Sequence, residues 1–184
     1  MSIEPLPLPS AEYLAECFIY DPGTGVFTWR ERPPSHFRGP RAGREHKRWN
    51  KRFSGTRAGG IRTGGYRSIN LDGKLRKASR LAWKMHTGAD PPGEVDHRNT
   101  IADDDRWDNL RIATRSQQNA NQHTRVTNRL GLKGVYPHGK KFGSRIMCDG
   151  KIRNLGVFVS AEEAHAAYCD AATERYGEFH NPGR

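Results

Sequence analysis

Apolar residues recur along this chain in short clusters with two different spacings. Residues 10–18 carry apolar side chains three and four positions apart, which predicts a short helix with Ser10 as its N-cap. Residues 19–29 place two apolar runs on either side of a Pro-Gly-x-Gly turn, which predicts a β-hairpin. The stretch GYRSINLDGKLRKA alternates around Asp-Gly and predicts a second hairpin. Residues 78–88 return to the helical spacing.

From residue 128 onward, the pattern predicts a small sheet covered by one helix. Three short alternating segments are separated by the turn sequences HGKK and CDGK. The following segment, SAEEAHAAYCDAATERYGE, has an apolar stripe at helical spacing. Ser160 and Glu163 form a capping box at its start, and Gly177 ends it. Three strands and one helix are enough for a small domain of their own.

Residues 33–65 show neither spacing and are rich in glycine, proline and arginine, which predicts an extended, mobile arm. Such segments are often only solvated. Here, however, Trp49 and Phe53 are interleaved with basic residues, a pattern also typical of contact with a nucleic-acid backbone. The candidate contacts in this arm are Arg48, Lys51 and Arg52.

The charge of the chain is large and unevenly distributed. The 184 residues carry a formal net charge of +11, which favours a polyanionic partner. Residues 38–84 hold 15 Lys and Arg against two acids, whereas residues 96–128 hold five of each sign. Carboxylates repel phosphate, so a simple nucleic-acid clamp has no use for the acids of the second segment. A metal site has such a use.

Composition also excludes several classes of protein. Hydrophobic residues make up 34% of the chain, which favours several small modules over one large core. No apolar run approaches the roughly 20 residues that cross a bilayer, so we expect a soluble, cytoplasmic protein without membrane partners. The three cysteines form no C-x-x-C pair, which argues against a zinc knuckle.

The most polar stretch of the chain has the residue types of a phosphodiesterase site. Val95-Asp96-His97 is predicted to end a strand, 109–112 to form a second strand, and Thr114 or Ser116 to cap a helix. This order brings Asp96, His97 and one helix asparagine close together. Carboxylate and amide oxygens suit Mg²⁺, and a neutral imidazole can take a proton from water.

Two segments resemble known families. VDHRNTIADDDRWDNLRIATRSQQNANQ resembles the HNH endonuclease family, in particular its phage and intron-encoded homing branch, and YRSINLDGKLRKASRLAWKMHTGADPPGEVDH matches the lead-in of that branch. GLKGVYPHGKKFGSRIMCDGKIRNLGVFVSAEEAHAAYCDAATERYGEF is similar to the plant ethylene-response type of DNA-binding domain, the APETALA-two fold. Together the resemblances cover about residues 60–180.

The first resemblance implies a role for each matching residue. Asp96 corresponds to a metal ligand, His97 to the general base, and Asn109 to a structural residue that holds the loop through backbone hydrogen bonds. Asn119 corresponds to the helix residue that completes the metal pair, with Asn121 and then His123 as alternatives. The implied cofactor is a divalent metal, Mg²⁺ or alternatively Mn²⁺. The usual Asp-Asn-Arg is Asp104-Asp105-Arg106 here, and we expect the extra acid to weaken substrate binding by repulsion.

The second resemblance implies that the three-stranded sheet lies in the major groove of double-stranded DNA. Basic and aromatic residues of its strands would then contact bases and backbone. By position, the candidate contacts are Lys133, Tyr136, Arg145, Lys151 and Arg153.

These expectations define an α+β protein with three parts: a helix, hairpin and basic arm at 1–65, a ββα-metal HNH nuclease domain at 66–127, and an APETALA-two-like domain at 128–184. The predicted activity is metal-dependent cleavage of DNA to 5′-phosphate and 3′-hydroxyl ends, with a monomer producing nicks. The alternative is a DNA-binding regulatory protein that keeps the fold but has lost activity. A nuclease that processes structured RNA is a third and weaker alternative.

Overall fold

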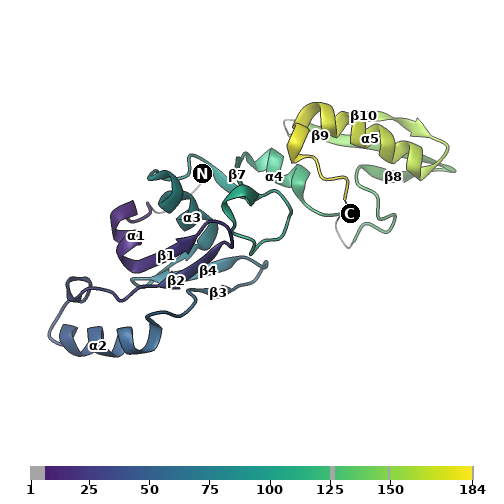
Figure 1. Ribbon diagram of the computed structural model, residues 1–184. Coiled ribbons are helices and arrows are strands. Elements are labelled where there is room, and N and C mark those ends of the chain that lie inside the picture. The colour runs from purple at the N-terminus through teal and green to yellow at the C-terminus, as the bar shows by residue number, and fades with distance from the viewer. Residues whose placement is uncertain (1–6, 125–126, 149, 184) are drawn as a thin grey trace. The chain divides into compact units, whose positions relative to one another are not determined.

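The protein is described from a computed structural model, which covers residues 7–124, 127–148 and 150–183. The chain divides into two compact units (Figure 1), Met1–Ile112 (unit 1) and Ala113–Arg184 (unit 2). Both mix helices with small sheets, as the α+β expectation requires. Within the described ranges, every helix is too short or too polar to span a lipid bilayer.

Unit 1 consists of hairpins and short helices whose boundaries follow local signals in the sequence. Ser10 caps α1 by accepting from the Tyr13 N–H, and Gly88 ends α3 in the left-handed conformation. Asp72 and Gly73 both have positive φ, as a two-residue hairpin turn requires. The elements are α1 Ala11–Cys17, β1 Phe18–Asp21, β2 Val26–Trp29, η1 Pro34–His36, α2 Ala42–Phe53, β3 Gly60–Ile61, β4 Arg67–Leu71, β5 Lys74–Lys77, α3 Ala78–Thr87, β6 Glu94–His97, η2 Trp107–Asn109 and β7 Leu110–Ala113.

One hydrophobic core runs through unit 1, so the predicted domain border at residue 65 is wrong. The core joins Leu14 and Phe27 from the N-terminal part to Ile69, Leu81 and Leu110 from the part beyond that border. The physical reason is size, because neither half buries enough apolar surface alone to form a separate domain. The predicted border at residue 127 is also displaced, since the compact units divide between residues 112 and 113.

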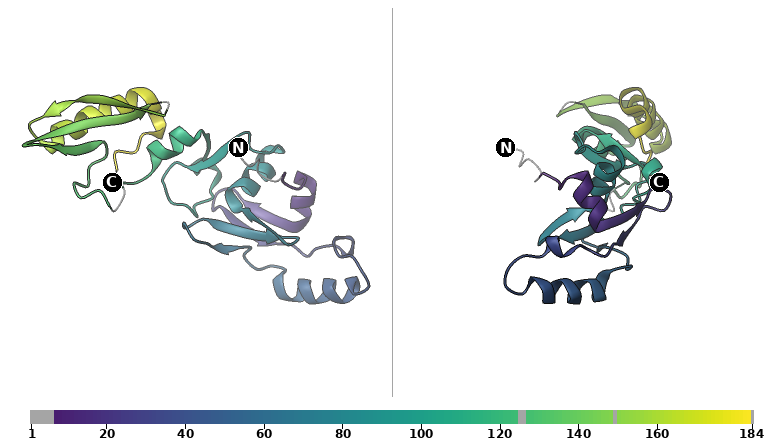
Figure 2. Two further views of the ribbon diagram at one scale, coloured as in Figure 1. Left: turned by 180° about the vertical axis from the view of Figure 1, so that it is seen from behind. Right: turned by 60° about the vertical axis from the view of Figure 1, so that its left-hand side comes forward.

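The predicted extended arm contains a helix. Residues 42–53 form α2, a three-turn helix at the periphery of unit 1 (Figures 1 and 2). Trp49 and Phe53 are partly buried against the core, and the polar residues His46 and Asn50 complete the inner face. Only two residues of this face are large and apolar, which is why the helical spacing is hard to recognise in the sequence.

Unit 2 contains the predicted three-stranded sheet and its covering helix (Figure 2). The strands lie in the order β10-β9-β8, all antiparallel. Ser160 and Glu163 form the predicted capping box of α5, whose stripe buries Ala164, Tyr168 and Ala172. The elements are α4 Arg115–Asn121, β8 Val135–His138, β9 Lys141–Cys148, β10 Lys151–Phe158, α5 Ala161–Tyr176 and η3 Gly177–Phe179.

Candidate active site

The strand that carries Asp96 and His97 is held by the core on one side and by a neighbouring strand on the other. β6 pairs with β7 in a two-stranded sheet. Val95 in β6 and Leu110 in β7 are both buried in the core of unit 1. Successive side chains of a strand point to opposite faces, so Asp96 and His97 have different neighbours.

Asn109 closes the loop between the two strands. Its side-chain oxygen accepts from the Asn99 N–H at 3.0 Å. Its amide donates to the Asp104 carbonyl at 2.7 Å and to the Asn99 side chain at 3.0 Å. The side chain therefore joins the two ends of the loop through hydrogen bonds, and the role of Asn109 in the nuclease stays a prediction. The residue lies in the 3₁₀ turn η2 and not in the strand itself.

Asp96 forms an ion pair with a residue of the neighbouring strand. The Nε of Arg111 donates to Asp96 Oδ2 at 3.0 Å, and the Asp96 side chain keeps about 12% of its surface exposed. Arg111 is buried, so the ion pair balances its charge inside the unit. The carboxylate of Asp96 is thus fixed in direction and still reaches solvent.

His97 is buried and forms a pair with Asp105. The distance from His97 Nε2 to Asp105 Oδ1 is 3.0 Å, and the two side chains are 4% and 2% exposed. An ionised carboxylate can only accept, so Nε2 carries the proton and donates it to Asp105. In the neutral imidazole the lone pair then lies on Nδ1. Asp105 therefore sets the tautomer that a general base needs.

This pair corrects the expectation for Asp105. We expected an acid close to the phosphate that would repel the substrate, but its side chain is buried beneath the loop and directed at His97. Its other oxygen, Oδ2, is buried without a hydrogen-bond partner among the described residues. The imidazole of His97 is therefore the side chain that donates to this carboxylate. The buried charge of Asp105 is stabilised by His97, and the orientation of the His97 ring is fixed by Asp105.

The N-terminal hairpin holds Asp105 in place. Tyr20 in β1 donates its hydroxyl to the Asp105 carbonyl at 2.8 Å. A Cβ on Gly25 would lie 2.5 Å from backbone atoms of Asp105 and Arg106, so only glycine allows the hairpin turn to approach this closely. The Trp107 N–H also donates to the Pro22 carbonyl. The N-terminal region is thus a structural part of the site.

The other acids of the loop stay near its surface. Asp104 accepts two hydrogen bonds from Arg106, which lower the pKa of Asp104 to about 2. Asp103 is exposed and lies 3.8 Å from Arg67. Asp108 is also exposed. Among these three acids, Asp104 is therefore the one that pairs with Arg106.

The carboxylate of Asp96 suits a hard divalent cation that takes few of its ligands from the protein. Across the part of the chain that the structure describes, no group of three or more His, Cys, Asp or Glu is placed to hold a metal. Mg²⁺ does not need such a cage, because it keeps several waters and takes substrate phosphate oxygens as ligands. One fixed, partly exposed carboxylate meets that requirement.

Comparison with known proteins identifies the segment. Residues 76–120 match the family model described as HNH endonuclease. This match supports an HNH nuclease domain in that segment. The segment contains Asp96, His97 and Asn109, and the protein is therefore a nuclease for which the family implies DNA as substrate. Searches of curated proteins and of solved structures found no match.

The HNH segment ends in α4, which belongs to unit 2. Of the two predicted caps, Thr114 and Ser116, it is Thr114 that caps this helix, through a capping box with Gln117. Asn119 is exposed, and its side-chain oxygen lies 3.5 Å from Gln122 Nε2. Asn121, the alternative ligand, is buried. The choice of Asn119 as partner of Asp96 stays a prediction.

The sheet of unit 2 has one covered and one open face, and this separates the five predicted DNA contacts. Residues directly opposite in an antiparallel pair share a face. Arg153 is paired with Ile146, and Lys151 with Cys148, both of which pack in the cluster with Tyr168 of α5. Arg153 and Lys151 therefore lie on the helix side, and their assignment to the open groove-binding face is wrong.

Arg145 and Tyr136 do lie on the open face. Arg145 pairs with Asn154, and its guanidinium lies 4.9 Å from the centre of the Tyr136 ring. A Cβ on Gly143 would meet that ring at 2.3 Å, so the glycine lets the ring lie flat across the strand. The two residues form a positively charged platform, which is the arrangement that a base or phosphate can contact.

Lys133 is not available for DNA. Its ammonium donates to the carbonyls of Ala120 and Asn181, at 2.9 and 2.8 Å. Burial lowers the pKa of Lys133 to about 8. The predicted DNA contact is therefore wrong, because the charge is used to join α4 to the C-terminal segment within unit 2.

Proposed function

We propose that the protein is a divalent-metal-dependent endonuclease that nicks double-stranded DNA to 5′-phosphate and 3′-hydroxyl ends. The observation behind this proposal is the buried hydrogen-bonded pair of His97 and Asp105. Asp96, which precedes His97 in the sequence, carries the adjacent carboxylate, and all three residues lie in the segment that matches the HNH family. A histidine with a fixed tautomer and an adjacent hard oxygen ligand are the two groups that hydrolysis of a phosphodiester needs.

Each residue has a distinct task in this reaction. His97 takes the proton of the attacking water at Nδ1. Asp105 keeps the Nε2 proton in place and stabilises the imidazolium that forms. Asp96, held in direction by Arg111, provides the oxygen ligand, and by family position Asn119 provides a second. When bound, a divalent ion stabilises the departing 3′ oxygen.

Two features favour the alternative of an inactive DNA-binding protein: the resemblance of the C-terminal segment to a DNA-binding domain, and Asp105, an acid where the family has an amide. The second of them no longer supports it. Because Asp105 pairs with His97 away from the surface, the departure supports the base and need not repel phosphate. We therefore favour an active enzyme, consistent with the HNH domain.

Supercoiled plasmid provides the test of metal dependence. We expect nicked circles with Mg²⁺, none with a chelator, and a loss of at least about 100-fold in Asp96→Asn, because the amide removes the charge that binds the cation. Asp103→Asn, the same change at an exposed position of the same segment, should cleave like the wild type. Equal cleavage by all three proteins would refute Asp96 as a ligand. Cleavage of structured RNA in preference to the plasmid would favour the RNA-processing alternative.

The open face of unit 2 provides the proposed targeting surface. We expect Arg145→Gln to weaken binding to DNA about ten-fold, as removal of one base or phosphate interaction should. Arg153→Gln removes the same charge from the helix side of the sheet and should change the Kd less than about two-fold. Gel shifts at fixed salt measure both. A greater effect of Arg153→Gln would mean that the other face binds DNA.

A further inference from the structure

The helix α2 has two sharply different faces. Its inner face consists of His46, Trp49, Asn50 and Phe53, all partly buried, while no residue of the helix is fully buried. At roughly 100° per residue, the exposed basic side chains occupy the opposite side, in an arc of roughly 140°. The basic residues of this arc, including the N-cap, are Arg41, Arg44, Lys47, Arg48, Lys51 and Arg52, and the one acid of the helix is Glu45.

The inner face is docked on unit 1 through both rings and hydrogen bonds. The Trp49 ring packs edge-on against Trp29, with 4.9 Å between ring centres, and Phe53 packs on Trp49 at 5.2 Å. Asn50 accepts from the Arg32 N–H at 3.0 Å and donates to the Arg32 carbonyl at 2.9 Å. The helix is therefore fixed in rotation, and its basic arc always faces outward.

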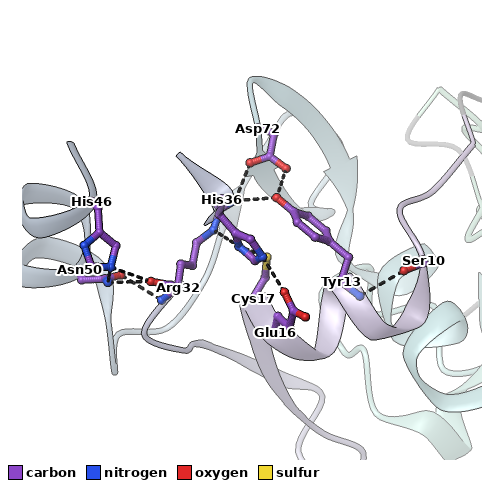
Figure 3. Close-up of polar contacts among 9 residues, drawn as sticks. All are labelled: Ser10, Tyr13, Glu16, Cys17, Arg32, His36, His46, Asn50 and Asp72. Atoms are coloured by element: carbon purple, nitrogen blue, oxygen red, sulfur yellow. Dashed lines mark hydrogen bonds and ion pairs between the residues drawn. The ribbon is translucent and has the colours of Figure 1, made fainter. Parts of the chain in front are cut away.

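Arg32, whose backbone binds Asn50 of α2, is itself fixed by several hydrogen bonds (Figure 3). Arg32 is 5% exposed and donates to Asp72 at 2.8 Å and to the Tyr13 hydroxyl at 2.6 Å. Its Nε donates to His36, whose other nitrogen contacts Glu16. The guanidinium of Arg32 is thus used inside the unit, and the docking of α2 does not depend on the charges of its basic arc.

We propose that α2 is a second DNA-binding element, which contacts the phosphate backbone of the substrate. The helix is about 18 Å long, and duplex DNA presents one phosphate per roughly 1.7 Å of its axis, so several basic side chains can reach phosphates together. Because the helix is docked before binding, little entropy is lost when DNA is bound. This inference rests on DNA being the substrate of the HNH domain.

The test compares two triple variants of the full chain. Arg44→Gln/Arg48→Gln/Lys51→Gln removes the centre of the arc with residues of similar helix propensity. Arg44→Lys/Arg48→Lys/Lys51→Arg keeps the charge and is the matched control. Binding to duplex DNA is measured with EDTA, so that no cleavage occurs, between about 50 and 200 mM salt, a range over which the Debye length falls about two-fold. Circular dichroism and thermal unfolding verify that both variants are folded.

We expect the glutamine triple to bind about 10- to 100-fold more weakly, with a salt slope shallower by about 2.7, or about 0.9 for each phosphate that is no longer neutralised. The control should stay within about three-fold of the wild type, because interactions with phosphate depend on charge. An unchanged Kd and slope in the glutamine triple would overturn the proposal, as would a loss confined to RNA. Failure of the nuclease proposal is separate, because it would appear as absent nicking in the wild type with Mg²⁺.

Discussion

Replacing His97 is expected to lower the rate of nicking by about a thousand-fold, within the range that a positioned general base contributes. Alanine at this position also leaves the buried carboxylate of Asp105 without its imidazole donor, which destabilises the fold. His97→Gln is the sharper variant, since its amide can still donate to Asp105 while it cannot act as a base near neutral pH. Single-turnover rates with excess enzyme measure the effect on chemistry.

The control for this variant is binding. His97→Gln should keep the wild-type Kd for DNA and unfold near the wild-type temperature, because Asp105 retains a donor. More than a tenth of the wild-type cleavage rate in a folded His97→Gln variant would mean that another group takes the proton from water.

Replacing Asp105 with asparagine is expected to lower the cleavage rate about 100-fold or more, with little change in affinity for DNA. The amide no longer stabilises the imidazolium, and its NH₂ group can face Nε2 and favour the opposite tautomer. Whether the cleavage rate falls or rises in this variant separates two roles for Asp105, the support of His97 and the repulsion of phosphate. If Asp105 instead repelled phosphate, as its place in the sequence first indicated, the same substitution would tighten binding and raise the rate.

Two readouts separate positioning from folding in this variant. The ¹⁵N chemical shifts of the His97 ring report which nitrogen carries the proton, and they should move toward the Nδ1–H tautomer in Asp105→Asn. Asp108→Asn, an equal change at an exposed position of the same loop, should leave both the shifts and the rate as in the wild type. A wild-type tautomer together with a wild-type rate in Asp105→Asn would contradict the role of Asp105.

The sequence predicts the local elements well because their signals are local. Ser10, Thr114 and Ser160 each cap the helix that follows them, and the Asp72-Gly73 turn forms the hairpin it indicates. These features depend on a few neighbouring residues. The position of His97 and Asp96 on β6 follows in the same way from an apolar strand pattern interrupted by polar residues.

The features that could not be predicted from the sequence depend on tertiary contacts. Asp105 reaches His97 because Asn109 closes the loop and Tyr20 binds it from a distant hairpin, and no spacing encodes that. The alternation of side chains along β10 shows which residues share a face with Arg153, but not which face α5 covers. The packing of α5 decides that, and it places Arg153 on the covered side. A buried polar partner for His97 could have been suspected from the acid-rich loop, but nothing local distinguishes Asp105 from its exposed neighbours.

The proposed mechanism requires that a divalent cation bound by Asp96 lies beside the imidazole of His97. Addition of Mn²⁺ in small amounts to the protein, followed by NMR, tests this directly because the paramagnetic ion broadens only nearby nuclei. We predict that the ring signals of His97 broaden first, and that Asp96→Asn abolishes the effect. Sharp His97 signals at a Mn²⁺ concentration that supports nicking would contradict this arrangement.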